Sequence, residues 1–215
     1  QSECASDHKF ANYWMHSGLL KINGEKMSKS LGNFAMLKDL FSSYHPEVIR
    51  YYLISSHYRS SLNFDNESLD QARSALTRLY QAASLVSLQE SDLHDDSVKE
   101  FINSMNDDLN TPEALSTLFG LAKLINSSQD TQDKSMYAST MRELGKVLGL
   151  LNESPEAFFQ YGANLTDEEI SKKIEERNQA RDAKDFQKAD QIRDELAAQG
   201  ILLDDSSDGT TWKKS

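Results

Sequence analysis

The chain has 215 residues, of which 38% are hydrophobic and 27% charged, and its formal net charge is −11. This composition predicts a soluble globular protein of one large or two modest domains, and no apolar run is long enough to cross a bilayer. The one cysteine, Cys4, excludes an internal disulfide framework and a cysteine-rich zinc site. It favours a reducing, cytoplasmic setting, and we expect no membrane partner.

The acidic excess is unevenly distributed. Residues 1–60 hold seven Lys and Arg against five Asp and Glu, residues 61–160 hold seven against sixteen, and residues 161–215 hold nine against thirteen. The net charge argues against nucleic acid as a partner, but the first segment is slightly basic. Total charge therefore does not decide the question.

The first third of the chain predicts short elements. Residues 11–18, "ANYWMHSG", read as the end of a helix that Gly18 closes. Residues 19–28 predict a β-hairpin, because their Asn-Gly pair favours a tight type I′ turn. Residues 36–44 and 45–58 then predict two short helices, the second with Pro46 near its first turn and with Val48, Ile49, Tyr52 and Leu53 at helical spacing.

Long amphipathic helices follow from about Asn66. The first carries one apolar stripe, which consists of Leu69, Ala72, Ala75, Leu76, Leu79 and Ala83. Residues 96–106, 110–126 and 133–151 predict three more helices, the middle one started by Asn110 or Thr111. Together the four helices predict an up-and-down bundle over 66–151.

The remainder predicts a linker at 152–165 and a separate module at 166–215. Thr166 and Glu169 form a capping box that opens one helix, and Gly200 closes a second. The expected buried face of the second helix consists of Phe186, Ala189, Ile192 and Leu196. The tail predicts two short strands joined by a turn at 207–209. The fold class expected from the whole pattern is mainly α, with a small C-terminal α+β module.

Chemistry is concentrated in the segment after the hairpin. Lys26-Met27-Ser28-Lys29-Ser30 places two flexible cations three residues apart in a Gly- and Ser-rich loop, which suits an anionic ligand such as phosphate. The alternative is a solvated basic loop. The five residues resemble the KMSKS signature of class I aminoacyl-tRNA synthetases. That resemblance implies ATP with Mg²⁺ as ligand, Lys29 as the main catalytic contact, Lys26 in support, and Met27, Ser28 and Ser30 as further parts of the ATP site. A lysine suits this role because it can stabilise the negative charge that develops on the phosphates.

Further blocks resemble bacterial cysteinyl-tRNA synthetase in that family's order. They are "NYWMHSGLL", "VIRYYLISSHYRSSLNFD", "FINSMNDDLNTPEAL" and "ARDAKDFQKADQIRDELAAQGILLDD…GTTW". The resemblance implies that 1–65 is the end of a catalytic domain with its KMSKS loop and stem-contact segment, and that 166–215 binds an anticodon. It also implies cysteine and tRNA(Cys) as substrates, and we expect a monomer.

One departure from that family changes the expected activity. The HIGH motif and the zinc ligands do not occur in this sequence, so the Zn²⁺ of the parent enzyme would be held outside this chain. Cys4 is expected to be a buried or incidental thiol, and His8 and His16 are expected to be packing or surface residues. We therefore interpret the chain, which begins at Gln1, as a fragment or processed product that is inactive alone.

The resemblance also suggests contacts to tRNA. Arg50 and Arg59, near His57 and Tyr58, would face its stem, although an ion pair explains Arg59 equally well. The proposed anticodon contacts are Arg177, Arg181, Arg193, Asp204, Asp205 and Trp212. Ion pairs along the helices explain much of the charge pattern there without RNA. Trp14 and His16 could border the amino-acid pocket, although a core position is favoured for Trp14.

Two alternative functions are retained. One is a ligase that joins cysteine to an amino-sugar and shares the KMSKS core. The anticodon-like C-terminal block argues against this ligase, because it has no tRNA to read. The other is a non-catalytic module that binds tRNA or another protein.

Overall fold

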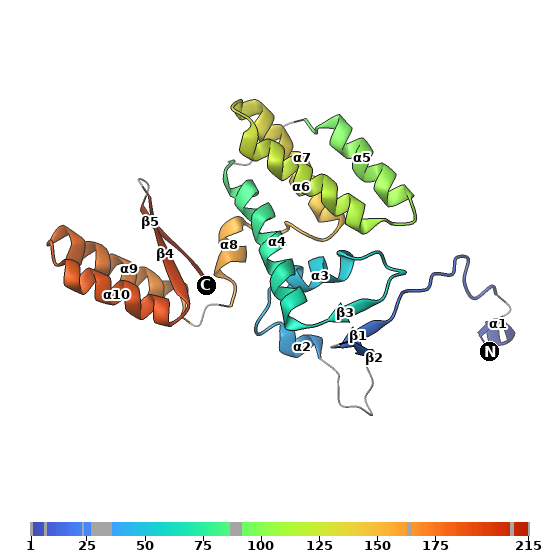
Figure 1. Cartoon of the computed structure of the whole chain (residues 1–215), viewed down its shortest axis with the longest axis horizontal. Helices are drawn as coiled ribbons and strands as arrows, with labels where there is room; N and C mark the ends of the chain where they lie inside the picture. The colour runs from blue at the N-terminus through green and yellow to red at the C-terminus, as the bar shows by residue number, and fades with distance from the viewer. Residues whose placement is uncertain are drawn as a thin grey trace.

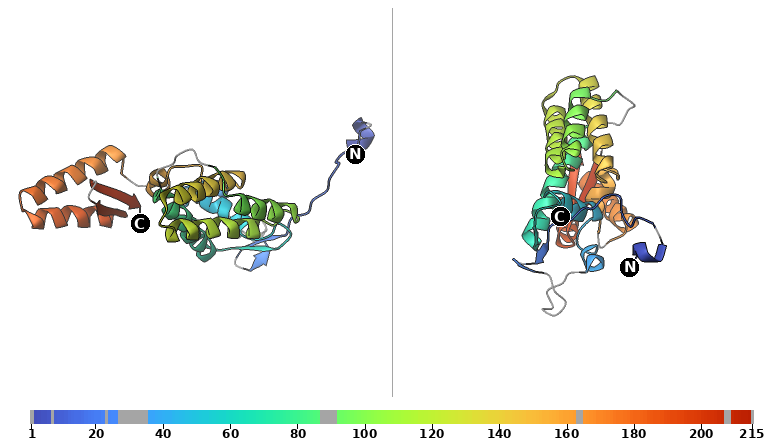
Figure 2. Two further views of the ribbon diagram at one scale, coloured as in Figure 1. Left: turned by 90° about the horizontal axis from the view of Figure 1, so that it is seen from above. Right: turned by 90° about the vertical axis from the view of Figure 1, so that its right-hand side faces the viewer.

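The computed structural model describes residues 2–6, 8–22, 24–26, 36–86, 92–162, 165–206 and 209–214. This part of the chain is mainly α, as predicted, with two small sheets (Figure 1). The helix α1 and the C-terminal module lie at opposite ends of the long axis, and the helical bundle lies between them (Figure 2). None of the helices in the described ranges is long and apolar enough to cross a membrane.

The N-terminal third contains the short elements. Its helices are α1 (Ser2–Ser6), α2 (Leu37–Leu40) and α3 (Pro46–Ile54). Its strands β1 (Leu20–Ile22), β2 (Glu25–Lys26) and β3 (Leu62–Phe64) form one sheet in the order β2-β1-β3. The strand β1 is antiparallel to β2 and parallel to β3, so the predicted hairpin is confirmed and its first strand is the central one.

The predicted helix end at 11–18 is wrong. Residues 13–19 have no regular secondary structure, and the Gly18 N–H donates to the carbonyl oxygen of Tyr58 at 2.7 Å. A Cβ on Gly18 would collide with the backbone carbonyl group of Ser60, so a side chain has no room there. The glycine therefore permits two backbones to approach each other, rather than closing a helix.

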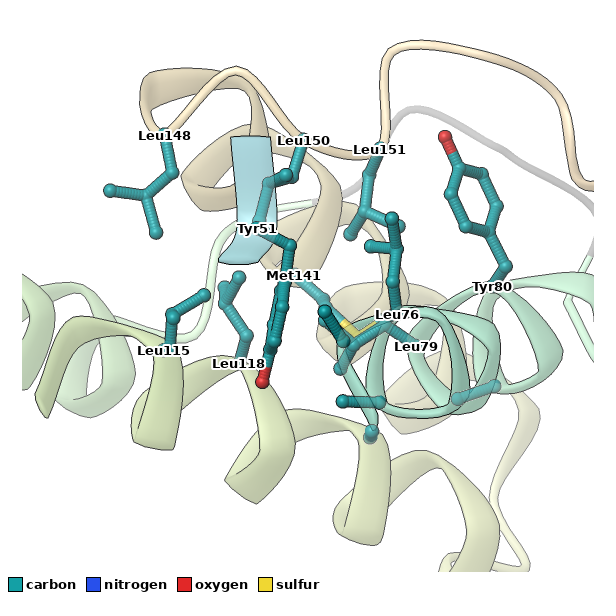
Figure 3. Close-up of a cluster of buried hydrophobic side chains, with 14 of the residues drawn as sticks. Tyr51, Leu76, Leu79, Tyr80, Leu115, Leu118, Met141, Leu148, Leu150 and Leu151 are labelled. Atoms are coloured by element: carbon teal, nitrogen blue, oxygen red, sulfur yellow. The ribbon is translucent and has the colours of Figure 1, made fainter. Parts of the chain in front are cut away.

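The predicted four-helix bundle is confirmed. It consists of α4 (Asn66–Ser84), α5 (Asp95–Asn106), α6 (Thr111–Ser127) and α7 (Thr131–Val147). Three of these helices begin where a side chain satisfies free backbone N–H groups: Asp65 caps α4, Asn110 caps α6 and Asp130 caps α7. The apolar stripes meet in one core, whose fully buried members include Leu76, Leu79, Leu118 and Met141 (Figure 3).

Two details of the packing differ from what the sequence predicted. Leu53 shares the predicted helical spacing of α3 but is 47% exposed, whereas Val48, Ile49 and Tyr52 are buried. The segment predicted as a linker contains α8 (Pro155–Gln160), which Ser154 caps. Phe158 of this helix stacks on Tyr80 of α4 with ring centroids 4.0 Å apart. The helix α8 is therefore packed against the bundle core.

A buried carboxylate joins α3 to the chain that follows α7. Glu47 accepts hydrogen bonds from the Tyr80 hydroxyl at 2.8 Å and from the backbone N–H groups of Leu151 and Asn152 at 2.9 and 3.0 Å. Burial, with the Glu47 carboxylate alongside, raises the pKa of Tyr80 well above its ordinary value. No sequence pattern predicts the backbone contacts, because Glu47 and their donors are more than a hundred residues apart.

The C-terminal module contains α9 (Asp167–Asp182), α10 (Phe186–Ala198) and the antiparallel strands β4 (Ile201–Ser206) and β5 (Gly209–Lys214). The predicted capping box of Thr166 and Glu169 is present, and it lowers the pKa of Glu169 through hydrogen bonds from Thr166. The core of the module is separate from that of the bundle and contains Ile170, Ile192, Leu196 and Ile201. Phe186 is 63% exposed, so its predicted place on the buried face is wrong.

Candidate functional site

The hairpin β1–β2 carries the lysine motif. In its register Lys21 opposes Lys26, and Ile22 opposes Glu25. Lys26 is therefore the last residue of β2, and it begins the motif. The remaining motif residues Met27, Ser28, Lys29 and Ser30 lie outside the described residues, so their predicted ATP contacts stay predictions.

The turn of this hairpin is hydrogen-bonded to the neighbouring strand and helix. The Gly24 N–H donates to Oδ1 of Asn63 at 2.6 Å, and Nδ2 of Asn63 donates to Oδ2 of Asp65 at 2.8 Å. Oδ1 of Asp65 accepts from the Ser68 N–H at 2.7 Å, which caps α4. The hydrogen bonds from Ser68 lower the pKa of Asp65. Gly24 has φ +83°, as expected of a tight turn.

The segment predicted to contact a tRNA stem is tied to the loop between α5 and α6. Arg59 donates two hydrogen bonds to the Asp108 carboxylate, at 2.6 and 3.0 Å, and the Tyr58 hydroxyl donates a third at 2.8 Å. These contacts, Arg59 first, lower the pKa of Asp108 to about 2. His57 lies 3.0 Å from the Asp108 carbonyl oxygen. Arg59 thus makes an ion pair, while its side chain stays 61% exposed.

Arg50 has a structural partner as well. Its Nε donates to the carbonyl oxygen of Leu148, just after α7 ends. A Cβ on Gly149 would collide with the Arg50 guanidinium, and Gly149 also has φ +71°. Arg50 therefore satisfies a carbonyl that the end of α7 leaves without a helical partner.

The charged residues of the C-terminal module converge on Asp205. Arg177 donates two hydrogen bonds to it at 2.9 and 2.7 Å, Arg181 donates at 2.9 Å, and the Thr210 hydroxyl donates at 2.8 Å. These contacts, Arg177 first and Thr210 next, hold the pKa of Asp205 far below its usual range. Arg177 is buried, so this predicted anticodon contact is occupied within the module. Arg193 is exposed and pairs with Asp190 and Asp194.

Trp212 belongs to β5 and lies where the C-terminal module faces α4 of the bundle. It is half-buried, packs against the module core, and lines a cleft of about 1170 Å³ with Arg73 and Thr77 of α4. Asp204 lines the same cleft. The structure therefore places Trp212 and Asp204 at the same cleft, whereas Arg177 is paired with Asp205.

Asn63 and Asp108 were not predicted from the sequence, because the residues that they contact lie far away in the chain.

The other candidates lie at the N-terminus. Cys4 is exposed and makes no disulfide. Trp14 is 69% exposed and contacts Phe10, so the favoured core position is wrong for this chain. His8 and His16, expected to be packing or surface residues, are exposed. Within the described ranges, no group of three or more His, Cys, Asp or Glu side chains could hold a metal ion.

Three families match successive parts of the chain. Residues 1–74 match the tRNA synthetases class I (C) catalytic domain, residues 100–152 match the DALR domain, and residues 166–212 match the cysteinyl-tRNA ligase anticodon binding domain. The lysine hairpin lies within the first match and the Asp205 cluster within the third. The three matched segments are therefore similar to successive parts of a class I aminoacyl-tRNA synthetase.

Similar proteins narrow this class. The chain is 47% identical over 218 residues to cysteine--tRNA ligase of Hydrogenovibrio crunogenus, a match that covers 100% of the chain and 47% of that protein. It is 47% identical over 219 residues to the same ligase of Francisella philomiragia (100% and 48%) and 46% identical over 217 residues to that of Azotobacter vinelandii (99% and 47%). With the three family matches, these relatives support a cysteinyl-tRNA synthetase fragment. The chain spans about half the length of the curated relatives it matches.

Proposed function

We propose that the chain supplies the KMSKS loop and the tRNA-binding domains of a cysteinyl-tRNA synthetase. The parent enzyme would join cysteine to ATP, giving cysteinyl adenylate and pyrophosphate, and then transfer the cysteinyl group to the terminal ribose of tRNA(Cys). The observation that carries the proposal is that the lysine motif begins at the last residue of the hairpin, Lys26, within a segment that matches a class I catalytic domain.

Lysines on this loop are suited to the first step. Attack of the cysteine carboxylate on the α-phosphate of ATP breaks the bond to the pyrophosphate, so negative charge grows on the phosphoryl oxygens. Lys29 would stabilise that charge, supported by Lys26, with Met27, Ser28 and Ser30 shaping the loop. Mg²⁺ would accompany the ATP phosphates, and the Zn²⁺ of the parent enzyme would have its ligands outside this chain.

The proposed tRNA contacts are divided among successive segments of the chain. Residues 1–65 would contribute the end of the catalytic domain and the stem contacts, 66–151 the helical bundle, and 166–215 the anticodon contacts beyond the 152–165 connection. Arg59, Arg181 and Arg193 have exposed guanidinium groups that could meet phosphate. Arg50 and Arg177 would act by holding Leu148 and Asp205 in place. The enzyme would work as a cytoplasmic monomer.

The test is ATP–pyrophosphate exchange. In the complete synthetase that contains this chain, we expect Lys29→Ala to lower the exchange rate by about a hundredfold, with a smaller effect on cysteine binding. The 215-residue chain alone is expected to show no cysteine-dependent exchange. Exchange by the Lys29→Ala enzyme within a few-fold of wild type would remove Lys29 from this role. Exchange by the purified chain alone would overturn the assignment of the chemistry to a larger enzyme.

A further inference from the structure

We propose that Lys214 and Gly162 form a joint that fixes the C-terminal module in the orientation in which it meets tRNA. The joint consists of one hydrogen bond, from Nζ of Lys214 to the carbonyl oxygen of Gly162. Both are positioning residues, and neither is assigned a contact with RNA. Their role rests on the proposed function, which gives the module its contacts with the anticodon.

The module has few other attachments to the rest of the chain. Its hydrophobic core is separate from the bundle core, so no shared core holds the two together. Within the described ranges, the principal contact across this boundary is that of β5 with α8. Beside it lies the cleft of about 1170 Å³, lined by α4, α8, α9 and β5, and the module lies at one end of the long axis (Figure 2). The orientation of the module therefore depends on a small contact area.

The backbone conformation of Gly162 suits this contact. Its φ is +73°, a value that glycine adopts without steric cost. A Cβ at this position would lie 3.0 Å from Nζ of Lys214, so a side chain would displace the ammonium group. An ammonium that donates to a carbonyl oxygen makes a charge-assisted hydrogen bond, which is stronger than one between neutral groups. Because the two residues are 52 positions apart, the bond returns the last strand of the module to the segment that follows α8.

The other side of the joint is held by aromatic side chains. The hydroxyl of Tyr161, next to Gly162, donates to the carbonyl oxygen of Phe41 at 2.9 Å. The His45 ring packs edge-on against the Tyr161 ring, with centroids 4.6 Å apart. Phe41 and His45 belong to the segment that matches a class I catalytic domain. Lys214 therefore ties the module to the part of the chain that contains the lysine hairpin.

A fixed module should bind tRNA more tightly than one that swings. In the proposed enzyme, one tRNA meets the catalytic segment and the module at the same time. A module that moves freely would lose orientational freedom when tRNA binds, and this loss weakens affinity. Activation of cysteine does not involve the tRNA, so this first step should not depend on the joint.

The first experiment measures the orientation of the module in the 215-residue chain and needs no activity. Nitroxide labels are attached to cysteines that replace two exposed residues, Lys123 of α6 and Gln187 of α10, in a Cys4→Ser background. Double electron–electron resonance then gives the distribution of distances between bundle and module. Lys214→Met should broaden this distribution about twofold, because the apolar side chain cannot donate to Gly162. Lys214→Arg, which keeps a charged donor, should stay close to wild type.

Two further variants separate the joint from a general loss of charge. Lys213→Met is the matched control, because it removes the same charge from the neighbouring, exposed residue on the other face of β5. This control should leave the distribution unchanged. Gly162→Ala should broaden it from the other side of the joint, since the new Cβ displaces Lys214. An unchanged distribution in Lys214→Met, or equal broadening in Lys213→Met, would overturn the joint.

The second experiment uses the complete synthetase. Lys214→Met should raise KM for tRNA(Cys) in aminoacylation about tenfold, with kcat within about threefold of wild type. ATP–pyrophosphate exchange without tRNA should be unchanged. Gly162→Ala should give the same pattern, and Lys214→Arg should again stay close to wild type. If Lys214 instead contacts an RNA phosphate, Gly162→Ala would leave KM unchanged and Lys214→Met would reduce the salt slope of tRNA binding by about one. That result would contradict a positioning role.

Removal of residues 166–215 separates the two proposals. If this truncation raises KM for tRNA(Cys) and Lys214→Met does not, the joint has no positioning role and the proposed function stands. If the truncation leaves KM unchanged, the module takes no part in tRNA recognition. The function proposed for the module then fails, whatever the distance distribution shows.

Discussion

Arg177 and Asp205 are joined by two parallel hydrogen bonds, of 2.9 and 2.7 Å, between α9 and β4. The Arg177 side chain is 9% exposed and that of Asp205 39% exposed. A planar guanidinium and a carboxylate match in this geometry, so the pair fixes the strand relative to the helix. Arg181 and Thr210 donate further hydrogen bonds to the same carboxylate.

We expect Asp205→Asn to destabilise the C-terminal module and to leave the bundle intact, because their hydrophobic cores are separate. The buried Arg177 would lose its counter-charge at a cost of roughly 1–3 kcal/mol, below that of a fully buried pair because Asp205 is partly exposed. Trp212 fluorescence in a Trp14→Phe background reports unfolding of the module. Asp194→Asn is the control, since its ion pair with Arg193 is exposed. An equal effect of the two variants would contradict the prediction.

The same carboxylate makes the module sensitive to acid. A group with a lowered folded pKa stabilises the fold above its unfolded pKa, here 3.8, and that stability is lost as the pH falls through the folded pKa. Asp108, whose folded pKa is about 2, behaves in the same way at the cluster with Arg59. We therefore expect stability to fall from about pH 5 downward. Urea denaturation between about pH 5 and pH 2 should show a flatter dependence for the module in Asp205→Asn than in wild type.

Glu47→Ala should be among the most destabilising substitutions in the bundle. It would leave the Tyr80 hydroxyl and the N–H groups of Leu151 and Asn152 without their acceptor, at a cost of roughly 2–4 kcal/mol. Glu143→Ala is the matched control, because Glu143 makes an exposed ion pair with Lys146 and should change the free energy of unfolding by less than about 1 kcal/mol. Chemical denaturation followed by circular dichroism measures both. Similar losses in the two variants would remove Glu47 from its structural role.

Alanine substitutions at two glycines should have opposite effects on the stability of the chain. Gly149→Ala should destabilise the chain by about 1–2 kcal/mol, because φ is +71° and the new methyl group collides with Arg50. Gly120→Ala, in the middle of α6 with no atom near the new Cβ, should stabilise it by up to about 1 kcal/mol. Thermal unfolding of the two variants tests the prediction. A neutral Gly149→Ala would show that Arg50 moves aside without cost.

Recognition of tRNA is expected to depend on the C-terminal module. Removing residues 166–215 should abolish the preference for tRNA(Cys) over an anticodon-swapped version, and should leave weak, salt-sensitive binding. Trp212→Ala should remove part of the preference, since stacking on one base is worth about 1–3 kcal/mol. Phe186→Ala is the control, because Phe186 is an exposed aromatic residue of the same module. Undiminished discrimination by the truncated chain would show that the module is structural.

Local signals in the sequence determined much of the fold. The predicted capping box at Thr166 and Glu169 is present, and Asn110, one of two predicted starts of α6, is its cap. Five of the six residues predicted for the apolar stripe of α4 are buried, and the sixth, Ala83, is partly buried. They could be predicted because a helix is governed by residues three or four positions apart. The lysine motif and the hairpin before it are equally local.

Only the tertiary structure decided which charged groups meet. Arg59 pairs with Asp108 across 49 residues and Asn63 meets Gly24 across 39. The sequence shows an arginine or an asparagine at these positions, but either side chain could form hydrogen bonds with solvent, with RNA or with a distant part of the backbone. The choice depends on how α3, β3 and the bundle pack. That packing is driven by the burial of apolar side chains. Because the hydrophobic effect is not directional, no sequence pattern marks the polar residues that it brings together.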